Sequence, residues 1–210
     1  MVIIGGWLVP ERTMMRLALA LLIAGLFAGC ATNVPQESVE KGAEAAAEPA
    51  VDPAAKAAFD AALKAMREGK DDQAEQILLS MTQDFPQFSG PQANLGIIYF
   101  RAGKLDKAEA AFLRAVEIKP TSAVSLDYLG VINRDKGRFK EAAGFYQRAI
   151  AADPNYAYAH RNYGILLELY MGKLKEALAQ YEEYQKLTKG EDKQVAKWII
   201  DLSRRSGAKK

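Results

Sequence analysis

Residues 89–122 read SGPQANLGIIYFRAGKLDKAEAAFLRAVEIKPTS and contain the clearest pattern in the chain. Apolar residues recur at helical spacing in two blocks of about 14 residues, separated by a turn that contains Gly103. A glycine tolerates the backbone conformation that follows a helix C-terminus, and Pro120 cannot continue the second block as a helix. The segment therefore predicts a helix, a turn and a second helix.

This pattern recurs along the chain with a period of about 34 residues. Three prolines, three glycines and three alanines each keep that spacing. They are Pro86, Pro120 and Pro154, then Gly69, Gly103 and Gly137, then Ala74, Ala108 and Ala142. Because three residue types share one period, the sequence predicts stacked structural repeats.

Residues 89–122 resemble the tetratricopeptide repeat (TPR), whose pattern is W-x2-L-G-x2-Y followed by A-x3-F, A and P. The matching residues are Leu95, Gly96, Tyr99, Ala108, Phe112, Ala115 and Pro120, with Gln92 at the tryptophan position. The resemblance covers residues 55–191 and implies four repeats, at 55–88, 89–122, 123–156 and 157–191. The first copy is degenerate, and the fourth has one inserted residue between its helices. The implied fold is all-α, a right-handed solenoid of helix-turn-helix units.

Small residues in the first helix of each repeat predict close contact between helices. Gly96, Gly130 and Gly164 let helix axes approach, and we expect Phe112, Tyr146 and Tyr181 to fill the space between neighbours.

The end of a repeat stack needs a polar outer surface. In residues 193–205, Val195, Trp198, Ile199 and Leu202 follow helical spacing, and charged residues occupy the other face. Residues 192–210 are therefore predicted to form a C-terminal capping helix and a basic tail.

The N-terminal region contains an apolar run, LALALLIAGLFAG, from Leu17 to Gly29. This run is too short to span a bilayer, which takes about 20 apolar residues, but it suits the apolar core of a signal peptide. Leu26 to Cys30 resemble the lipobox of bacterial lipoproteins, in which a cysteine after small residues is lipidated and becomes the mature N-terminus. The resemblance implies a signal peptide at 1–29 and a lipid anchor on Cys30, against the alternative of an ordinary signal peptide or a buried helix. We expect translation to start at Met14 or Met15.

Residues 30–54 follow the signal peptide and are rich in Ala, Glu and Pro without apolar periodicity. Such a composition predicts a flexible, mildly acidic tether. Ala31 is not the Asp that retains lipoproteins at the inner membrane in some bacteria, so the resemblance favours an outer-membrane anchor that faces the periplasm.

The composition of the whole chain excludes several kinds of site. The 210 residues carry 28 Lys and Arg against 26 Asp and Glu, a formal charge of +2 that gives no phosphate-binding field, so we expect no nucleic-acid partner. One Cys and one His are too few for a structural zinc site. No P-loop, Rossmann glycine fingerprint or paired-His zinc helix occurs, and we expect no metal, cofactor or small-molecule substrate.

The single histidine, His160, lies among Tyr156, Tyr158 and Tyr163 where the repeat often has Trp. A packing or groove role is favoured over catalysis, and we expect no enzyme activity. A pair of carboxylates needs no local motif, so a carboxylate-based envelope hydrolase stays open as the least favoured alternative.

The TPR resemblance also implies a concave binding face made by the first helix of each repeat, chiefly through its positions 2, 5, 9, 12 and 13. Transferred to this sequence, these positions predict a peptide-binding groove. Its residues are Phe59, Leu63, Met66, Ile97, Phe100, Arg101, Asp127, Val131, Arg134, Tyr158, Arg161, Ile165 and Glu168. The alternative for each residue is an ion pair within its helix or between repeats.

Together these observations favour a noncatalytic adaptor on the bacterial envelope. Lipid-anchored in the membrane, it would recruit or position another envelope protein, for example in pilus or secretin assembly or beside peptidoglycan enzymes. A self-oligomerising accessory subunit is the alternative.

Overall fold

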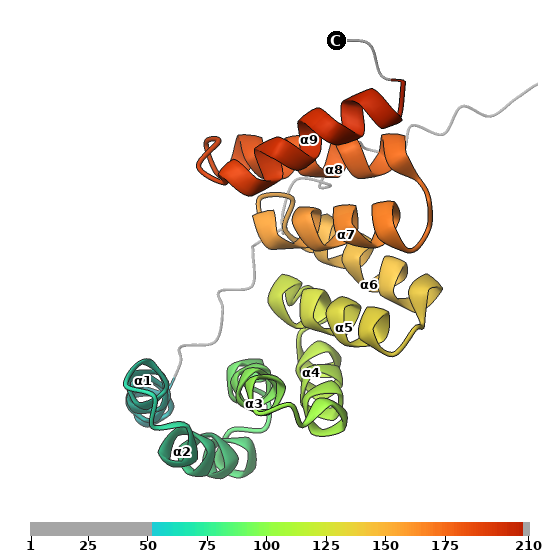
Figure 1. The fold of residues 1–210 in the computed structure, drawn as a ribbon. Helices are drawn as coiled ribbons and strands as arrows, with labels where there is room; N and C mark the ends of the chain where they lie inside the picture. Colours follow the sequence, from blue (N-terminus) through green and yellow to red (C-terminus); the bar gives the residue numbers. More distant parts are fainter. Residues whose placement is uncertain (1–51, 208–210) are drawn as a thin grey trace, which may run out of the picture. The chain divides into compact units, whose positions relative to one another are not determined.

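The computed structural model describes residues 52–207, and Figure 1 shows them as a stack of helices. The predicted signal peptide, Cys30 and nearly all of the predicted tether lie outside the described residues, as do the last three residues of the basic tail. Between residues 52 and 207 the secondary structure comprises nine helices and no strands. They are α1 (Pro53–Arg67), α2 (Asp71–Asp84), α3 (Ser89–Arg101), α4 (Leu105–Ile118), α5 (Ala123–Asp135), α6 (Phe139–Ala152), α7 (Ala157–Leu169), α8 (Leu174–Leu187) and α9 (Lys193–Arg205). The predicted all-α helical solenoid is confirmed.

The helices pack in the order of the chain. Helices α1 and α2, α3 and α4, α5 and α6, and α7 and α8 form pairs, and each pair packs against the next. The first helices α3, α5 and α7 also contact one another along the stack, so they form its inner layer. Side chains from three successive repeats can therefore meet on one face.

Short turns join the two helices of each pair. Gly103, in the turn between α3 and α4, has a φ of +71°, in the left-handed region that glycine adopts without a steric penalty. In the last pair the turn comprises residues 170–173, one residue more than the 102–104 turn, and Gly172 has a φ of +65°. The inserted residue of the fourth repeat thus lies in a turn, where it does not disturb the helix contacts.

Aromatic rings fill the space above three helical glycines. A Cβ atom at Gly96 would lie 2.7 Å from the Phe112 ring, and one at Gly130 would lie 2.5 Å from the Tyr146 ring. These separations are shorter than any ordinary carbon contact, so only glycine fits without displacing the ring. Gly164 has the same relation to Tyr181, at 2.5 Å. The expected close approach of the paired helices is present in all three repeats.

Helix α1 begins at Pro53, two residues before the predicted start of the first repeat at 55. The Asp52 side chain accepts a hydrogen bond from the backbone N–H of Ala54 at 2.8 Å, and proline stands at the first helical position. Both are sequence signals of a helix start. The helix thus includes the last two residues of the segment in which the composition predicts a tether.

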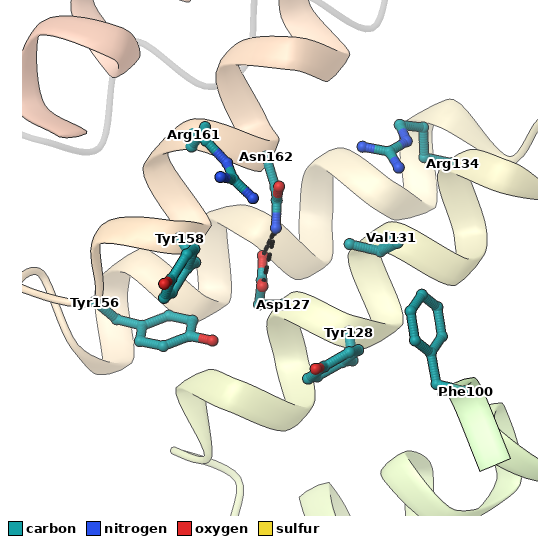
Figure 2. A pocket seen from close by; sticks show the side chains of 9 residues that line it. All are labelled: Phe100, Asp127, Tyr128, Val131, Arg134, Tyr156, Tyr158, Arg161 and Asn162. Atoms are coloured by element: carbon teal, nitrogen blue, oxygen red, sulfur yellow. Dashed lines mark hydrogen bonds between the residues drawn. The ribbon is translucent and has the colours of Figure 1, made fainter. Parts of the chain in front are cut away.

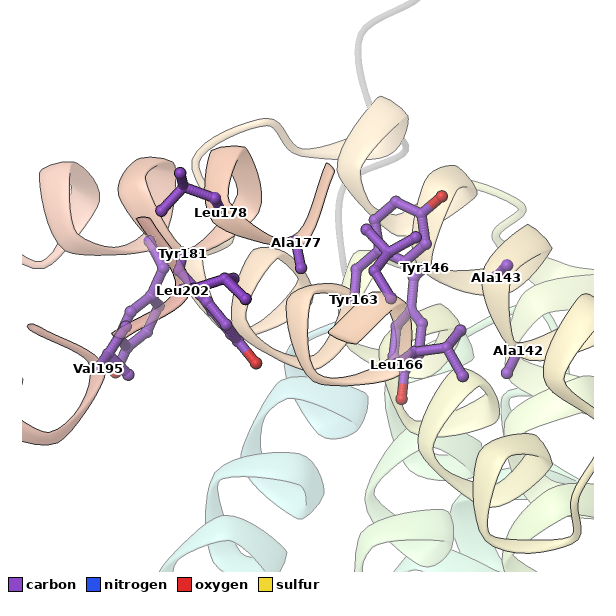
Figure 3. Packing of buried hydrophobic residues seen from close by; sticks show 12 residues of the cluster. Ala142, Ala143, Tyr146, Tyr163, Leu166, Ala177, Leu178, Tyr181, Val195 and Leu202 are labelled. Atoms are coloured by element: carbon purple, nitrogen blue, oxygen red, sulfur yellow. The ribbon is translucent and has the colours of Figure 1, made fainter. Parts of the chain in front are cut away.

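Helix α9 packs on α8 at the C-terminal end of the stack, as Figure 1 shows. Val195 and Leu202 are buried, and the Trp198 ring lies 5.6 Å from the Tyr181 ring. Figure 3 shows Val195 and Leu202 beside Tyr181 in the same apolar cluster. The predicted capping helix is therefore continuous with the core of the fourth repeat.

Candidate functional site

A cavity of about 530 Å³ lies on the inner layer, between α3, α5 and α7. Figure 2 shows the side chains that line it. They are Phe100 of α3, Asp127, Tyr128, Val131 and Arg134 of α5, Tyr156 just before α7, and Tyr158, Arg161 and Asn162 of α7. The volume lies within the range of pockets that hold small ligands or parts of larger ones. We call this cavity the inner pocket.

A buried carboxylate and an amide meet at the centre of the inner pocket (Figure 2). The Asn162 side-chain nitrogen donates to both carboxylate oxygens of Asp127, at 3.0 Å each. Asp127 is only 4% exposed, and this burial raises its pKa to about 6, against the opposing effects of the Asn162 hydrogen bond and of Arg161 and Arg134. The contact between Asp127 and Asn162 ties α5 to α7 and leaves Asp127 little surface for a ligand.

Two arginines lie on the inner pocket and differ in their partners. The Arg134 guanidinium donates to the Asp135 carboxylate at 3.0 and 3.2 Å, which neutralises its charge locally. The Arg161 guanidinium lies over the rings of Tyr158 and Tyr184, 5.2 and 5.7 Å from their centroids. Within residues 52–207, no acidic side chain lies at ion-pair distance from Arg161, and its Nε is buried without a hydrogen-bond partner. Arg161 is thus held by aromatic rings and carries a charge that no ion pair neutralises.

Aromatic side chains form much of the pocket wall. The Tyr128 ring stacks on Phe112 of the core at 4.8 Å and meets the Phe100 ring edge-on at 5.1 Å. Burial raises the pKa of Tyr128 and of Tyr156, so both phenols are neutral in the physiological range. On the opposite side Tyr158 is 53% exposed, so part of its ring is open to contact. The wall can therefore offer apolar contact to a bound segment.

The inner pocket brings together six of the residues that sequence reasoning placed in a groove. These are Phe100, Asp127, Val131, Arg134, Tyr158 and Arg161. Sequence reasoning missed Tyr128, Tyr156 and Asn162. Tyr128 and Asn162 both occupy position 6 of a repeat, next to the position-5 residues, and Tyr156 closes the third repeat. An aromatic or amide residue at position 6 in two successive repeats is the signal that would have indicated them.

The other predicted groove residues do not line the inner pocket. Phe59 packs against Phe88, with ring centroids 5.0 Å apart, and Glu168 is paired with Arg205 at 2.6 Å and accepts from the Tyr181 hydroxyl at 3.2 Å. Glu168 therefore takes the ion-pair alternative, and Phe59 makes a packing contact instead. Three further predicted residues are partly buried and pack against apolar clusters, namely Met66, Ile97 and Ile165. Leu63 is half-buried on α1, and Arg101 is exposed at the end of α3.

His160 is buried and lies outside the inner pocket. Its Nε2 is 3.0 Å from the Pro154 carbonyl oxygen, which can only accept, so Nε2 carries a hydrogen and donates. Its Nδ1 is 2.9 Å from the Gln180 side chain. Both ring nitrogens thus contact neighbouring residues of the stack, which corresponds to the packing part of the predicted packing or groove role.

Metal-binding and membrane-spanning features are absent from residues 52–207. No group of three or more His, Cys, Asp or Glu side chains there is arranged to hold a metal ion. In the same part of the chain, every helix is too short or too polar to cross a membrane.

Sequence models support the repeat. One tetratricopeptide repeat model matches residues 91–155 and a second matches residues 145–179. A comparison with curated protein sequences gave no match.

Solved structures share the fold. The MamA protein is 24% identical with a TM-score of 0.61, over 73% of this chain and 82% of that one. PilF of Pseudomonas aeruginosa is 20% identical with a TM-score of 0.65, over 73% of this chain and 69% of that one. The first TPR domain of Spaghetti (RPAP3), bound to an HSP90 peptide, is 20% identical with a TM-score of 0.53, over 58% of this chain and 95% of that one. Repeat-model matches and shared fold together support the tetratricopeptide repeat family, and the described helices form a TPR-like solenoid.

Proposed function

We propose that this chain is a noncatalytic adaptor that binds a segment of a partner protein in the inner pocket. The observation that carries the proposal is the meeting of three repeats around one cavity, with an aromatic wall and an arginine that makes no ion pair within residues 52–207. Concave sites with apolar walls and a few placed polar groups are typical of ligand binding. The RPAP3 domain, which shares the fold, is bound to a peptide of HSP90.

We further propose that the adaptor acts at the bacterial envelope, anchored to the outer membrane by lipid on Cys30 and facing the periplasm. In this place it would recruit a protein of pilus or secretin assembly, or position a peptidoglycan enzyme. The support for this location comes from the sequence alone. The apolar run from Leu17 to Gly29 ends at Cys30, which is the only cysteine in the 210 residues.

The lipid anchor can be tested with one substitution. Stable membrane attachment takes more than one acyl chain, and the diacylglyceryl group of a bacterial lipoprotein would provide that. Cys30→Ser should abolish fatty-acid labelling and release the protein from the membrane fraction. Retention in the membrane without label would instead indicate an uncleaved helix.

Binding in the inner pocket can be tested by photo-crosslinking in cells. A photoreactive residue at Tyr158 or Phe100 should capture one partner protein, because both side chains line the pocket. Matched probes belong at Leu113 of α4, which is 42% exposed, and at Lys140 of α6, which is also exposed. Capture of the same protein with equal yield from the outer helices would contradict recognition in the pocket.

Self-association is the second candidate. Large apolar side chains are exposed near the C-terminal end of the stack, among them Leu169 at 66%, Tyr170 at 48% and Ile200 at 48%. Such side chains can mediate contact between copies of a chain. Light scattering over a range of concentrations separates the two candidates, since a concentration-independent monomer is incompatible with self-association.

A further inference from the structure

Arg161 is the charged group of the inner pocket that is free to meet a ligand. Arg134 is already paired with Asp135, and both oxygens of Asp127 accept from Asn162. Arg161 makes no ion pair within residues 52–207, and Figure 2 shows its guanidinium directed toward the centre of the pocket. Arg161 is therefore the cation lining the pocket that has no carboxylate at ion-pair distance within residues 52–207, although its charge also acts on Asp127 and Asp192.

Two aromatic rings restrict the guanidinium of Arg161. The rings of Tyr158 and Tyr184 lie on it, and the Tyr184 hydroxyl donates to the Asp192 carboxylate at 3.0 Å, which fixes that ring. Aromatic faces attract a guanidinium and leave its planar edge of N–H donors available. A side chain that is already ordered loses little conformational entropy when it binds, so this arrangement favours recognition of a planar, bidentate acceptor.

The buried carboxylate of Asp127 limits the charge of that acceptor. It lies at the centre of the pocket and is close enough to Arg161 for the arginine to lower its pKa. A doubly charged phosphate group would be repelled by an ionised Asp127, whereas a single carboxylate adds only one negative charge. The pocket therefore matches a carboxylate better than a phosphate.

We propose, on the basis of the proposed function, that Arg161 binds an aspartate or glutamate side chain of the partner segment. The neighbouring surface of Phe100, Tyr128 and Val131 takes a bulky apolar residue of the same segment. The partner is thus recognised by an acidic residue close to an apolar one.

The test uses the purified full chain in detergent and random peptides displayed within a phage coat protein, so that no terminal carboxylate is offered. The wild type should enrich peptides that combine Asp or Glu with a bulky apolar residue. Arg161→Gln should lose the acidic preference and keep the apolar one. Arg148→Gln is the matched control, because Arg148 also lies over a ring, that of Phe145 at 5.7 Å, but does not line the pocket.

An enriched peptide and its Glu→Gln version then give a double-mutant cycle. We expect the peptide change and Arg161→Gln each to weaken binding by about tenfold, and the combination to weaken it little further. Arg161→Lys, which keeps the charge without the planar edge, should bind with intermediate affinity. Thermal unfolding of each variant checks that the stack is intact.

The outcomes separate this inference from the proposed function. Peptides that bind in the pocket without any acidic preference would overturn the role of Arg161 and leave the adaptor function standing. If the wild type enriches no peptide, or if Phe100→Ala and Tyr158→Ala bind the same peptides unchanged, the pocket is not a peptide site and both proposals fail.

Discussion

The first and third repeats share a period but fill their helix contacts differently. Ala62 and Leu78 of the first repeat occupy the positions that Gly130 and Tyr146 occupy two repeats later. All four are buried, and each pair combines a small residue with a larger one. The first repeat has an alanine and a leucine in one apolar cluster, whereas the third has a glycine beneath a tyrosine ring. The repeat therefore retains the space between its helices and not the residues that fill it.

The same two repeats also differ on the inner face. Phe59 of the first repeat packs against Phe88, while Asp127, at the equivalent position of the third, is hydrogen-bonded to Asn162 in the inner pocket. An aromatic ring at this position closes the gap to the next repeat, and a short polar side chain leaves a cavity there. The inner positions are therefore where one repeat leaves a cavity while another closes the gap by packing.

Gly130→Leu should produce the largest loss of stability, because it places a bulky side chain where the third repeat, unlike the first, has only a glycine. A Cβ at this position would already lie 2.5 Å from the Tyr146 ring, and Tyr146 is fully buried, so the surrounding core opposes its displacement. Overpacking of this kind costs about 1 to 3 kcal/mol in the free energy of unfolding. Thermal or urea unfolding measures the loss, and an unchanged transition would show that the helices separate without penalty.

Asp127→Asn should stabilise the protein at neutral pH and not in acid. Burial raises the pKa of Asp127 from 3.8 to about 6, so the folded state binds the proton more tightly than the unfolded state. The free energy of unfolding therefore falls as the pH rises from about 4 to about 6 and stays low above that. This shift in pKa corresponds to at most about 3 kcal/mol in the free energy of unfolding. Part of that gain is lost because the single oxygen of the new amide accepts fewer hydrogen bonds from Asn162 than the carboxylate does. We therefore expect a net gain in stability of about 1 to 2 kcal/mol.

The comparison of the variant with the wild type should be made at several pH values, so that other titrating groups cancel. The stability gain is expected to vanish below about pH 3, where Asp127 is protonated in both the folded and the unfolded state. A difference that does not change between about pH 3 and about pH 8 would mean that Asp127 titrates normally and that its burial carries no cost.

The sequence was sufficient to predict the fold because each repeat carries the same constraints. Pro86, Pro120 and Pro154 end equivalent helices at equal spacing, and the glycine-aromatic pairs define which faces meet. The start of α1 was harder to predict, since the Asp52 cap lies in an Ala/Glu/Pro-rich segment that carries no apolar period. A capping signal is local and is easily assigned to the neighbouring segment.

The candidate site was only partly predictable. Position counting along the first helices identified Asp127 and Arg161, because position 5 of α5 and of α7 lines the inner pocket. It did not identify Asn162, which lines the pocket through its hydrogen bonds to Asp127 of the preceding repeat, or Tyr156, which precedes α7. It also included Glu168, which is engaged in an ion pair. Which inner residues are free for a ligand depends on three-dimensional neighbours that the period does not contain.

Transfer of the first repeat's pair into the third gives a smaller effect that tests the comparison directly. Gly130→Ala and Tyr146→Leu recreate the combination of Ala62 and Leu78. Each single change is expected to destabilise the fold, the first by crowding the ring and the second by leaving a cavity. Because the added methyl group occupies part of that cavity, the double variant should lose about 1 kcal/mol less than the sum of the two single losses. Strict additivity would show that the two positions do not share one space.

Gly144→Ala should give the smallest change and one of opposite sign. Gly144 lies inside α6, and a Cβ there would meet no atom within 4 Å, in contrast to Gly130. Glycine inside a helix is less favourable than alanine by about 0.5 to 1 kcal/mol, and the second repeat has Ala110 at the equivalent position. The variant should therefore unfold at a slightly higher temperature. A destabilised Gly144→Ala would indicate that helical glycines in this chain are needed for a reason other than space, and the interpretation of Gly130 would have to change with it.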